Sequence, residues 1–403
     1  MKWEGRHPAP PPDRASRVAV RAYGGRVAPS PADPDDSTPP FIVEAVGTRV
    51  GIELSGLDAT SRVEIGRAWS GARAVGTADP DTVVTPSATA TAGQMLSDVS
   101  STVTHAAISA RRGALLMLHA AGLASPDGRV TVLVGPSGAG KTTATRALAR
   151  YRGYVTDETV GIDGDGTVHP YRKPLSVITD GQPFKVQLSP GELGLHPIPA
   201  TRLRVGRFVL LDRRSDPTPA RLVPVPSSEA LTALAPHCSA LAAFPRPLRT
   251  MARLLAETGG AVRAEYSEAQ DLVVLLNAMD AADPALWSGS AGDVTDDVSS
   301  ADSDLELPID RDILGPRYRR PDVVDWVALA DDRIAVLTAA PDGSGTLRVL
   351  AGLAPLLWQA APGVAHDALV QAVVTEIGDP AAEAGVVGIL DELVESGLLA
   401  LSD

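Results

Sequence analysis

The feature that most constrains the fold is the segment 135–142, which follows an apolar stretch and precedes a helix-forming one. It reads Gly-Pro-Ser-Gly-Ala-Gly-Lys-Thr and matches the pattern G-x-x-x-x-G-K-[S/T] at every fixed position. The β-branched run 130–134 before it predicts a buried strand, and residues 141–151 after it predict a helix. Because strand, glycine-rich loop and helix in this order form the context in which the pattern binds phosphate, the sequence predicts a nucleotide-binding loop in an α/β domain.

Each residue type in this loop has a physical task. Glycines let consecutive backbone N–H groups point inward, and the helix N-terminus adds partial positive charge. The lysine of such a loop reaches the β- and γ-phosphates, and the threonine hydroxyl ligates Mg²⁺, so the expected cofactors are ATP and Mg²⁺. The predicted nucleotide-binding residues are Gly135, Pro136, Ser137, Gly138, Ala139, Gly140, Lys141, Thr142 and Thr143.

Phosphoryl transfer also needs a carboxylate for the metal ion, and two positions compete for that role. Asp157 and Glu158 follow the strand-like run 153–156, whereas Asp212 ends the apolar run 206–211. Arg213 and Arg214 stand next to Asp212 and offer it an ordinary ion pair. A solvated carboxylate at a strand end is the alternative interpretation of both positions.

Residues 118–163 resemble the core of the HPr kinase/phosphorylase family. In that family a histidine-bearing strand precedes the phosphate-binding loop, and paired carboxylates follow the helix after it; here these are His119 and the pair Asp157–Glu158. The order of motifs is closer still to HPr-kinase-like proteins of lasso-peptide and related gene clusters, which carry a downstream tract like residues 169–175. The resemblance covers about residues 90–270. It implies a core similar to phosphoenolpyruvate carboxykinase rather than to Ras-like proteins.

The resemblance also implies roles for individual side chains. One carboxylate of the pair would coordinate Mg²⁺ and the other would accept the proton of the attacking hydroxyl, with Lys141 as a further catalytic residue. Glu158 departs from the usual Asp-Asp pair. His119 would contact phosphate or pair with a carboxylate, unless it is a satisfied core histidine. Arg172 and Lys173 would contact phosphate or acceptor, unless they form a solvated basic turn. HPr is not expected as the substrate, because no convincing copy of the family's downstream coupling segment is present.

The last eighty residues show a different pattern, in which strand-like alternation is followed by three amphipathic helices. The expected strands lie within 325–337 and 345–352, and the expected helices at 353–361, 368–377 and 386–396. Over about residues 322–401 this order resembles PqqD, a peptide chaperone or recognition element for ribosomally made peptides. Such elements bind a leader peptide as an added strand. The groove implied here is formed by Leu347, Val349, Leu390 and Val394.

We therefore expect an α/β protein with a β-rich N-terminal region and a winged-helix-like C-terminal domain. The expected segments are a disordered Pro-rich tail at 1–40, a β-rich region at 41–90, the phosphate-loop domain at 91–280, an acidic flexible linker at 281–312 that lets the modules move, and the PqqD-like domain at 313–403. The runs 41–46, 48–54 and 61–69 predict strands of an antiparallel sheet.

Composition excludes several functions. A net charge of −13 argues against nucleic-acid partners, and few basic residues in the C-terminal segment disfavour DNA binding there. No apolar run is long enough to span a membrane. The single cysteine, Cys238, excludes an internal disulfide framework. The N-terminus lacks the apolar region of a secretory signal, so we expect a cytoplasmic protein.

These patterns predict a Mg²⁺–ATP-dependent kinase that phosphorylates a Ser or Thr hydroxyl of a ribosomally made precursor peptide, with other peptide-modifying enzymes as partners. Two alternatives stay open: a kinase of a small-molecule hydroxyl, and a nucleotide-gated peptide chaperone without phosphoryl transfer. The sequence also leaves open which carboxylate is the base, and whether the donor is ATP, GTP or pyrophosphate.

Overall fold

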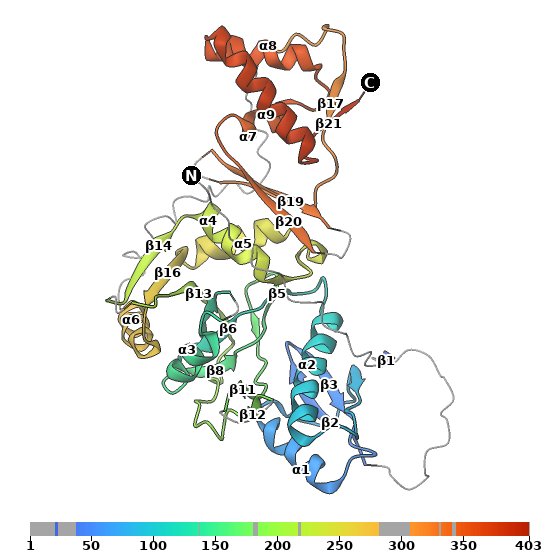
Figure 1. Ribbon diagram of the computed structural model, residues 1–403, viewed down its shortest axis with the longest axis vertical. Coiled ribbons are helices and arrows are strands. Elements are labelled where there is room, and N and C mark those ends of the chain that lie inside the picture. The colour runs from blue at the N-terminus through green and yellow to red at the C-terminus, as the bar shows by residue number, and fades with distance from the viewer. Residues whose placement is uncertain are drawn as a thin grey trace, which may run out of the picture.

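A computed structural model describes residues 21–22, 38–136, 138–179, 184–216, 219–281, 307–329, 332–340 and 344–402. The expected Pro-rich tail, apart from a few residues, and Ser137 lie outside these ranges, as does most of the expected acidic linker. The described chain is a mixed α/β structure with several sheets (Figure 1). Among the described residues, no helix combines the length and the apolar character that crossing a membrane requires.

The strand before the phosphate-binding loop, β7 (Arg129–Val134), lies inside a six-stranded sheet with the order β14-β16-β13-β7-β6-β8. It pairs in parallel with β13 and antiparallel with β6. The other bounds are β6 (Ala121–Ala124), β8 (Gly153–Thr156), β13 (Arg204–Arg213), β14 (Arg221–Val225) and β16 (Ala261–Tyr266). The strand predicted at 130–134 is therefore present as β7, and the apolar run 206–211 lies within β13.

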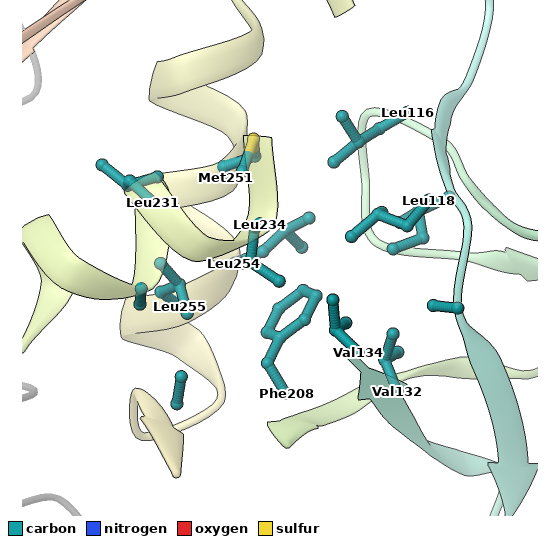
Figure 2. Close-up of a cluster of buried hydrophobic side chains, with 14 of the residues drawn as sticks. Leu116, Leu118, Val132, Val134, Phe208, Leu231, Leu234, Met251, Leu254 and Leu255 are labelled. Atoms are coloured by element: carbon teal, nitrogen blue, oxygen red, sulfur yellow. The ribbon is translucent and has the colours of Figure 1, made fainter. Parts of the chain in front are cut away.

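Helices cover both faces of this sheet because successive residues of a strand point to opposite sides. Val132, Val134 and Phe208 pack against α4 (Ser227–Leu234) and α5 (Pro247–Glu257), as Figure 2 shows. Leu133 and Val209 belong to the opposite core, which α3 (Lys141–Leu148) and α6 (Ala269–Ala281) cover. The phosphate-binding loop is thus anchored in a strand that is buried on both faces.

A second sheet of four antiparallel strands has the order β10-β9-β5-β15. Its strands are β5 (Leu116–Leu118), β9 (Val160–Ile162), β10 (Val168–His169) and β15 (Cys238–Ser239). Two chain segments pass from one sheet to the other. Residues 115–124 form β5 of the four-stranded sheet and then β6 of the six-stranded sheet, with the change at His119. Residues 153–163 form β8 of the six-stranded sheet and then β9 of the four-stranded sheet, with the change at Asp157. The Ala120 N–H donates to the carbonyl of Glu158 at 3.1 Å, so both crossings lie side by side.

The N-terminal part is a sheet with the order β1-β4-β3-β2, built from β1 (Arg21–Ala22), β2 (Phe41–Ala45), β3 (Thr48–Ile52) and β4 (Thr82–Val84). The strand predicted at 61–69 is wrong, because α1 (Ala59–Ala68) occupies that range. The Asp58 carboxylate accepts a hydrogen bond from Ser61 N–H at 2.8 Å and caps the helix. The long helix α2 (Ala92–Ala110) packs on this sheet. The domain boundary expected between residues 90 and 91 would divide α2 from the sheet that it covers.

The C-terminal part contains the predicted strands and helices. An antiparallel sheet has the order β18-β19-β20, with β18 (Asp325–Ala328), β19 (Ile334–Ala339) and β20 (Gly345–Leu350). The helices are α7 (Ala354–Ala360), α8 (His366–Ile377) and α9 (Glu383–Glu395), and β17 (Arg317–Arg319) pairs with β21 (Ala400–Ser402).

This three-stranded sheet is packed on both faces. Ile334 and Val336 lie in a core with the C-terminal helices, whereas Ala335 and Leu337 lie in the core that holds Phe208. Both α4 and α5 contact the sheet (Figure 1). In the described residues, the C-terminal domain therefore shares apolar core with the phosphate-loop domain, while the flexible linker expected at 281–312 stays a prediction.

A polar contact fixes this interface at the start of α5. The buried carboxylate of Asp325 in β18 accepts a hydrogen bond from the Arg249 N–H at 3.1 Å and lies 3.3 Å from Arg249 Nε. The Arg249 guanidinium also lies 5.7 Å from the ring centre of Trp326. Asp325 thus caps a helix of the neighbouring domain and pairs with a cation in its first turn.

We expect Asp325→Ala to lower the free energy of unfolding by about 1–3 kcal/mol, because it leaves the part-buried Arg249 N–H without its acceptor and removes the ion pair with Arg249. Urea unfolding followed by tryptophan fluorescence measures this. Asp322→Ala is the matched control, because Asp322 is exposed in the segment before the same strand. Equal stability of the two variants would contradict the capping role.

Candidate functional site

The phosphate-binding loop has the backbone that its glycines predict. Gly138 and Gly140 have φ angles of 85° and 84°, in the left-handed region that favours glycine, and α3 begins directly after them. The Lys141 ammonium donates to the Gly135 carbonyl at 2.7 Å and to the Pro136 carbonyl at 3.3 Å. Burial lowers the pKa of Lys141, and the negative charge of Glu158 opposes this shift. Lys141 therefore lies within electrostatic reach of the acidic pair.

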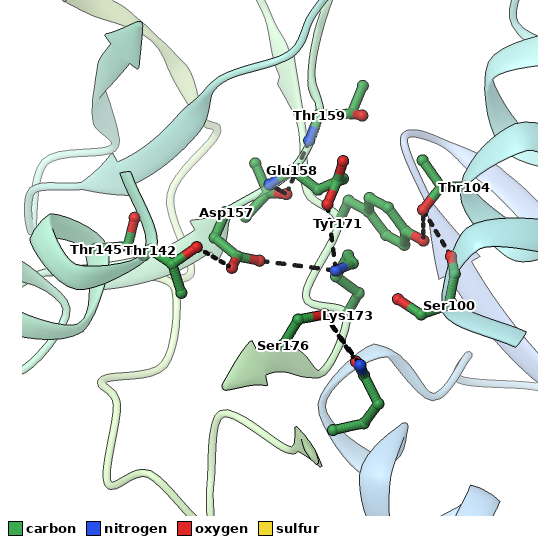
Figure 3. Close-up of polar contacts among 12 residues, drawn as sticks. Ser100, Thr104, Thr142, Thr145, Asp157, Glu158, Thr159, Tyr171, Lys173 and Ser176 are labelled. Atoms are coloured by element: carbon green, nitrogen blue, oxygen red, sulfur yellow. Dashed lines mark hydrogen bonds and ion pairs between the residues drawn. The ribbon is translucent and has the colours of Figure 1, made fainter. Parts of the chain in front are cut away.

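Asp157 lies beside the loop and is almost fully buried, with 4% of its side chain exposed. Its Oδ2 is 3.4 Å from the Thr142 hydroxyl, and its Oδ1 accepts from the Tyr154 hydroxyl at 2.9 Å. Figure 3 shows Thr142, Asp157 and Lys173 in one row of contacts. The structure thus brings the predicted threonine and the first predicted carboxylate together.

Glu158 points the other way from the same turn. Its Oε1 is 3.3 Å from His119 Nδ1, and its Oε2 is 3.5 Å from Lys173 Nζ. Burial raises the pKa of Glu158, but the hydrogen bond from His119 and the charge of Lys173 outweigh it and hold the pKa at about 2. With 35% of its side chain exposed, Glu158 stays ionised and open to a ligand.

Lys173 holds the two carboxylates together. Its side chain is only 2% exposed, and its Nζ lies 4.0 Å from Asp157 Oδ1 as well as near Glu158. The charge of Lys173 lowers the pKa of Glu158, and its position links the two acidic side chains. Arg172 points elsewhere: its Nε donates to the Tyr154 carbonyl at 3.2 Å and so braces β8. Neither residue belongs to a solvated basic turn.

The competing carboxylate, Asp212, is occupied by an ion pair. It lies 2.9 Å from Arg214 Nη2, which also lies 3.3 Å from Glu265 of the adjacent strand. Arg213 turns to the Ser267 carbonyl, to which its Nε donates at 3.1 Å. The contact with Thr142 is made by Asp157, so the geometry favours Asp157 as the metal-binding carboxylate.

The donor set suits Mg²⁺ bound together with a nucleotide. Mg²⁺ prefers hard oxygen ligands and is usually held by one or two carboxylates plus substrate phosphates. Thr142 and Asp157 supply such oxygens at the edge of the loop. No group of three or more His, Cys, Asp or Glu side chains in the described part of the chain is arranged to hold a metal ion by itself. The site therefore fits a metal ion that arrives with phosphate.

A polar cavity of about 430 Å³ opens next to Glu158 and Lys173. Helix α2 contributes one wall, and β11 (Leu175–Val177) and the region of β12 (Val186–Leu188) contribute another. The lining residues are Ser97, Ser100, Ser101, Thr104, His105, Glu158, Lys173, Ser176, Phe184 and Lys185. Thr104 donates to the Ser100 carbonyl and accepts from the buried Tyr171 hydroxyl, both at 2.8 Å, which fixes this wall.

Sequence reasoning missed this wall and the two tyrosines. Ser97, Ser100, Ser101 and Thr104 recur at helical spacing on α2, opposite its apolar stripe, and that polar stripe was the available signal. For Tyr154 the available signal was the strand period: Tyr154 and Thr156 are two residues apart in a strand, so their side chains lie on the same face. Tyr171 gave no such signal, because it lies in a segment without regular structure.

The predicted peptide groove does not form one surface. Leu347 and Val349 face the core shared with α4 and α5, whereas Leu390 and Val394 pack in the core of the C-terminal helices. The β20 strand separates the two pairs because its side chains alternate. The residues of β20 on the helix side are Thr346, Arg348 and Leu350.

No known protein-family model matches the chain, and no curated protein matches it. Among solved structures, the chain is similar to the HPr(Ser) kinase/phosphatase from Coxiella burnetii, with 14% sequence identity and a TM-score of 0.23. The match covers 41% of this chain and 93% of that chain. A TM-score this low carries no argument about fold or function, so a functional assignment depends on the geometry of the site.

We expect His119→Ala to raise the pKa of Glu158 from about 2 toward the ordinary carboxyl value, because it removes the hydrogen bond that favours the charged form. The carboxyl ¹³C shift of glutamate-labelled protein, followed from about pH 6 to about pH 3, measures this. Wild-type Glu158 should stay ionised over that range, and the variant should begin to take up a proton as the pH falls. His196→Ala, at an exposed histidine, is the control. An unchanged titration in His119→Ala would show that the His119 contact does not hold the pKa down.

Proposed function

We propose that the chain is a Mg²⁺–ATP-dependent phosphotransferase that phosphorylates a Ser or Thr hydroxyl of a precursor peptide. The observation that carries this proposal is the position of the acidic pair: Asp157 faces the Thr142 hydroxyl at 3.4 Å, while Glu158 faces a separate polar cavity. In this proposal, the side that would bind the phosphate donor begins at Asp157, and the side that would bind the acceptor hydroxyl begins at the adjacent Glu158.

Each residue of the site has a separate role in the proposed reaction. When bound, Mg²⁺–ATP supplies the phosphoryl group and a metal charge that neutralises its oxygens. Lys141 and the loop N–H groups hold the phosphates, and Thr142 with Asp157 holds the metal ion. Glu158 accepts a hydrogen bond from the acceptor hydroxyl and orients it. The new O–P bond forms as the bond to the leaving ADP breaks, and the hydroxyl proton leaves through the Glu158–His119 pair. Because the transition state is loose, orientation contributes more than the strength of the base.

The C-terminal sheet supports peptide recruitment through one edge. At the β18 edge, Arg249 Nε donates to the Trp326 carbonyl at 3.2 Å. At the other end of the strand order lies β20, to which an extended peptide would add as a fourth strand. Because this sheet is packed on α4 and α5, a peptide there would be held at a fixed orientation to the site, in place of a long flexible tether.

A second candidate, phosphorylation of a small-molecule hydroxyl, is favoured by the cavity itself. Its volume of about 430 Å³ lies within the range of small-ligand sites, and the wall of hydroxyls would suit a polar metabolite. Transfer to a small molecule without a peptide would support this candidate over the first.

We expect Asp157→Asn to lower the phosphoryl-transfer rate by about a hundredfold or more, and Asp212→Asn to change it less than about threefold. Asp157 is the carboxylate that contacts the loop threonine, whereas Asp212 is held by Arg214. Transfer is measured by the intact mass of the precursor peptide after incubation with protein, ATP and Mg²⁺, where one phosphate adds about 80 Da.

Lys141→Ala is the negative control and should leave the peptide mass unchanged. A larger loss in Asp212→Asn than in Asp157→Asn would mean that the metal carboxylate is Asp212. If no variant and no wild-type protein transfers phosphate to the peptide, the small-molecule candidate or a chaperone without transfer takes its place.

We expect Arg348→Glu to weaken binding of the precursor peptide by about tenfold at unchanged maximal rate, because Arg348 lies on the helix-facing side of the β20 edge. Fluorescence anisotropy of the labelled peptide measures binding to the full chain. Arg311→Glu makes the same charge change at an exposed position just before the same domain. Deleting residues 313–403 is a poorer test, since it would uncover the apolar surface of α4 and α5. Equal affinity of both variants would remove β20 from the binding site.

A further inference from the structure

A second histidine lies opposite His119. His237 is the last residue of the short helix η2 (Ala235–His237), which directly follows α4. After it comes β15, in which Cys238 pairs with Leu118 and Ser239 with Met117. If this antiparallel register continues by one residue, His237 lies opposite His119. The His119 N–H donates to the His237 carbonyl at 2.7 Å, which shows that the pairing extends this far.

This register has a consequence for the side chains. Opposite residues of an antiparallel pair project to the same face, with about 5 Å between their Cβ atoms. The face that His119 occupies is that of the acidic pair, since its Nδ1 lies 3.3 Å from Glu158. His237 therefore projects toward the same space from the far side of His119, although the two are far apart in sequence.

The charged surroundings of His237 agree with this placement. Burial lowers its pKa, and the positive charges of Lys141 and His119 lower it further. The neighbouring groups come from three elements: Lys141 begins α3, His119 follows β5, and Glu158, which follows β8, lies beyond His119. The Cys238 thiol turns away from this space to the Leu234 carbonyl at 3.5 Å. The imidazole thus lies near the lysine that holds nucleotide phosphates.

We propose that His237 is a further catalytic residue of this site, whose imidazole N–H donates a hydrogen bond to a phosphate oxygen of the bound nucleotide beside Lys141. This inference rests on the proposed function. A neutral imidazole adds a directed donor without adding a further full positive charge next to Lys141. An anionic phosphate at this place would favour the protonated imidazole, so nucleotide binding should raise the pKa of His237.

The position of His237 is set by the packing of α4. Leu231 and Leu234 of that helix are buried in the core shown in Figure 2, together with Val134 at the end of the phosphate-loop strand. The same helix contacts β20 of the C-terminal sheet. The residue is therefore held by the core that joins the two domains, which makes it suited to a fixed contact with phosphate.

The direct test is histidine NMR of the full chain. The sequence has seven histidines, and His237→Gln and His119→Gln assign two of the resonances. Saturating Mg²⁺ with the non-hydrolysable analogue AMP-PNP should shift the His119 and His237 signals and move the titration midpoint of His237 to higher pH. The signals of His196 and His366, which lie outside the site, should not move.

The outcomes separate the two proposals. If AMP-PNP moves the His119 signal and leaves His237 unchanged, the role of His237 is wrong while nucleotide binding stands. If a fluorescent ATP analogue fails to bind the wild-type chain, the proposed function falls and the inference falls with it.

Kinetics gives an independent test that uses ATP alone as the probe. His237→Ala should lower kcat for slow ATP hydrolysis by about tenfold or more and change KM less, while His237→Gln keeps more activity because its amide still donates. His196→Ala is the matched control and should match the wild type. If His237→Ala hydrolyses ATP at the wild-type rate, His237 does not contact the reacting phosphate. If the alanine variant fails to fold, the glutamine variant decides through its NMR and kinetic behaviour.

Discussion

The site depends on one constraint, which is that two chain segments cross between the same two sheets at the same point. The backbone hydrogen bond from Ala120 to Glu158 ties the crossings together. His119 belongs to one crossing, and Asp157 and Glu158 belong to the other. The crossings place Asp157 beside Thr142 of the phosphate-binding loop and His119 beside Glu158. The loop, the acidic pair and the histidine thus meet although they come from separate segments of the sequence.

The electrostatics of the site follow from that meeting. Two adjacent carboxylates in a partly buried place repel each other and favour protonation unless cations compensate them. Lys173, with its ammonium between the two, supplies that compensation, and His119 adds a hydrogen bond to Glu158. Because these contacts hold the pKa of Glu158 at about 2, its carboxylate stays charged near neutral pH. A change of activity near neutral pH must come from another group, and the histidines are the side chains that titrate there.

The sequence predicted those features that consecutive residues specify, and it did not predict those that depend on pairing between distant segments. The phosphate-binding loop is local, since eight consecutive residues specify its backbone, and the strands and helices of the C-terminal domain follow from hydrophobic periodicity. The helix at 59–68 was missed because its signal is a single cap, Asp58, ahead of a weakly apolar segment. The strand expected to carry His119 ends at Leu118, and this end was missed because an apolar run does not show that it changes sheet. His237 was not predictable, because its place depends on pairing with a strand far away in the sequence.

The polar cavity beside Glu158 lies between two separate segments of the chain. One wall is α2, which packs on the N-terminal sheet, and the opposite residues belong to the phosphate-loop domain. The cavity proposed for the acceptor is therefore an interface between elements, whereas the proposed nucleotide site is a single strand, loop and helix. The residues that line such an interface can be substituted while the sequence of the phosphate-binding loop stays the same. Under the proposed function, substitutions along the α2 stripe would alter which hydroxyl is accepted and leave nucleotide binding unchanged, because only Glu158 and Lys173 both line the cavity and lie next to Asp157.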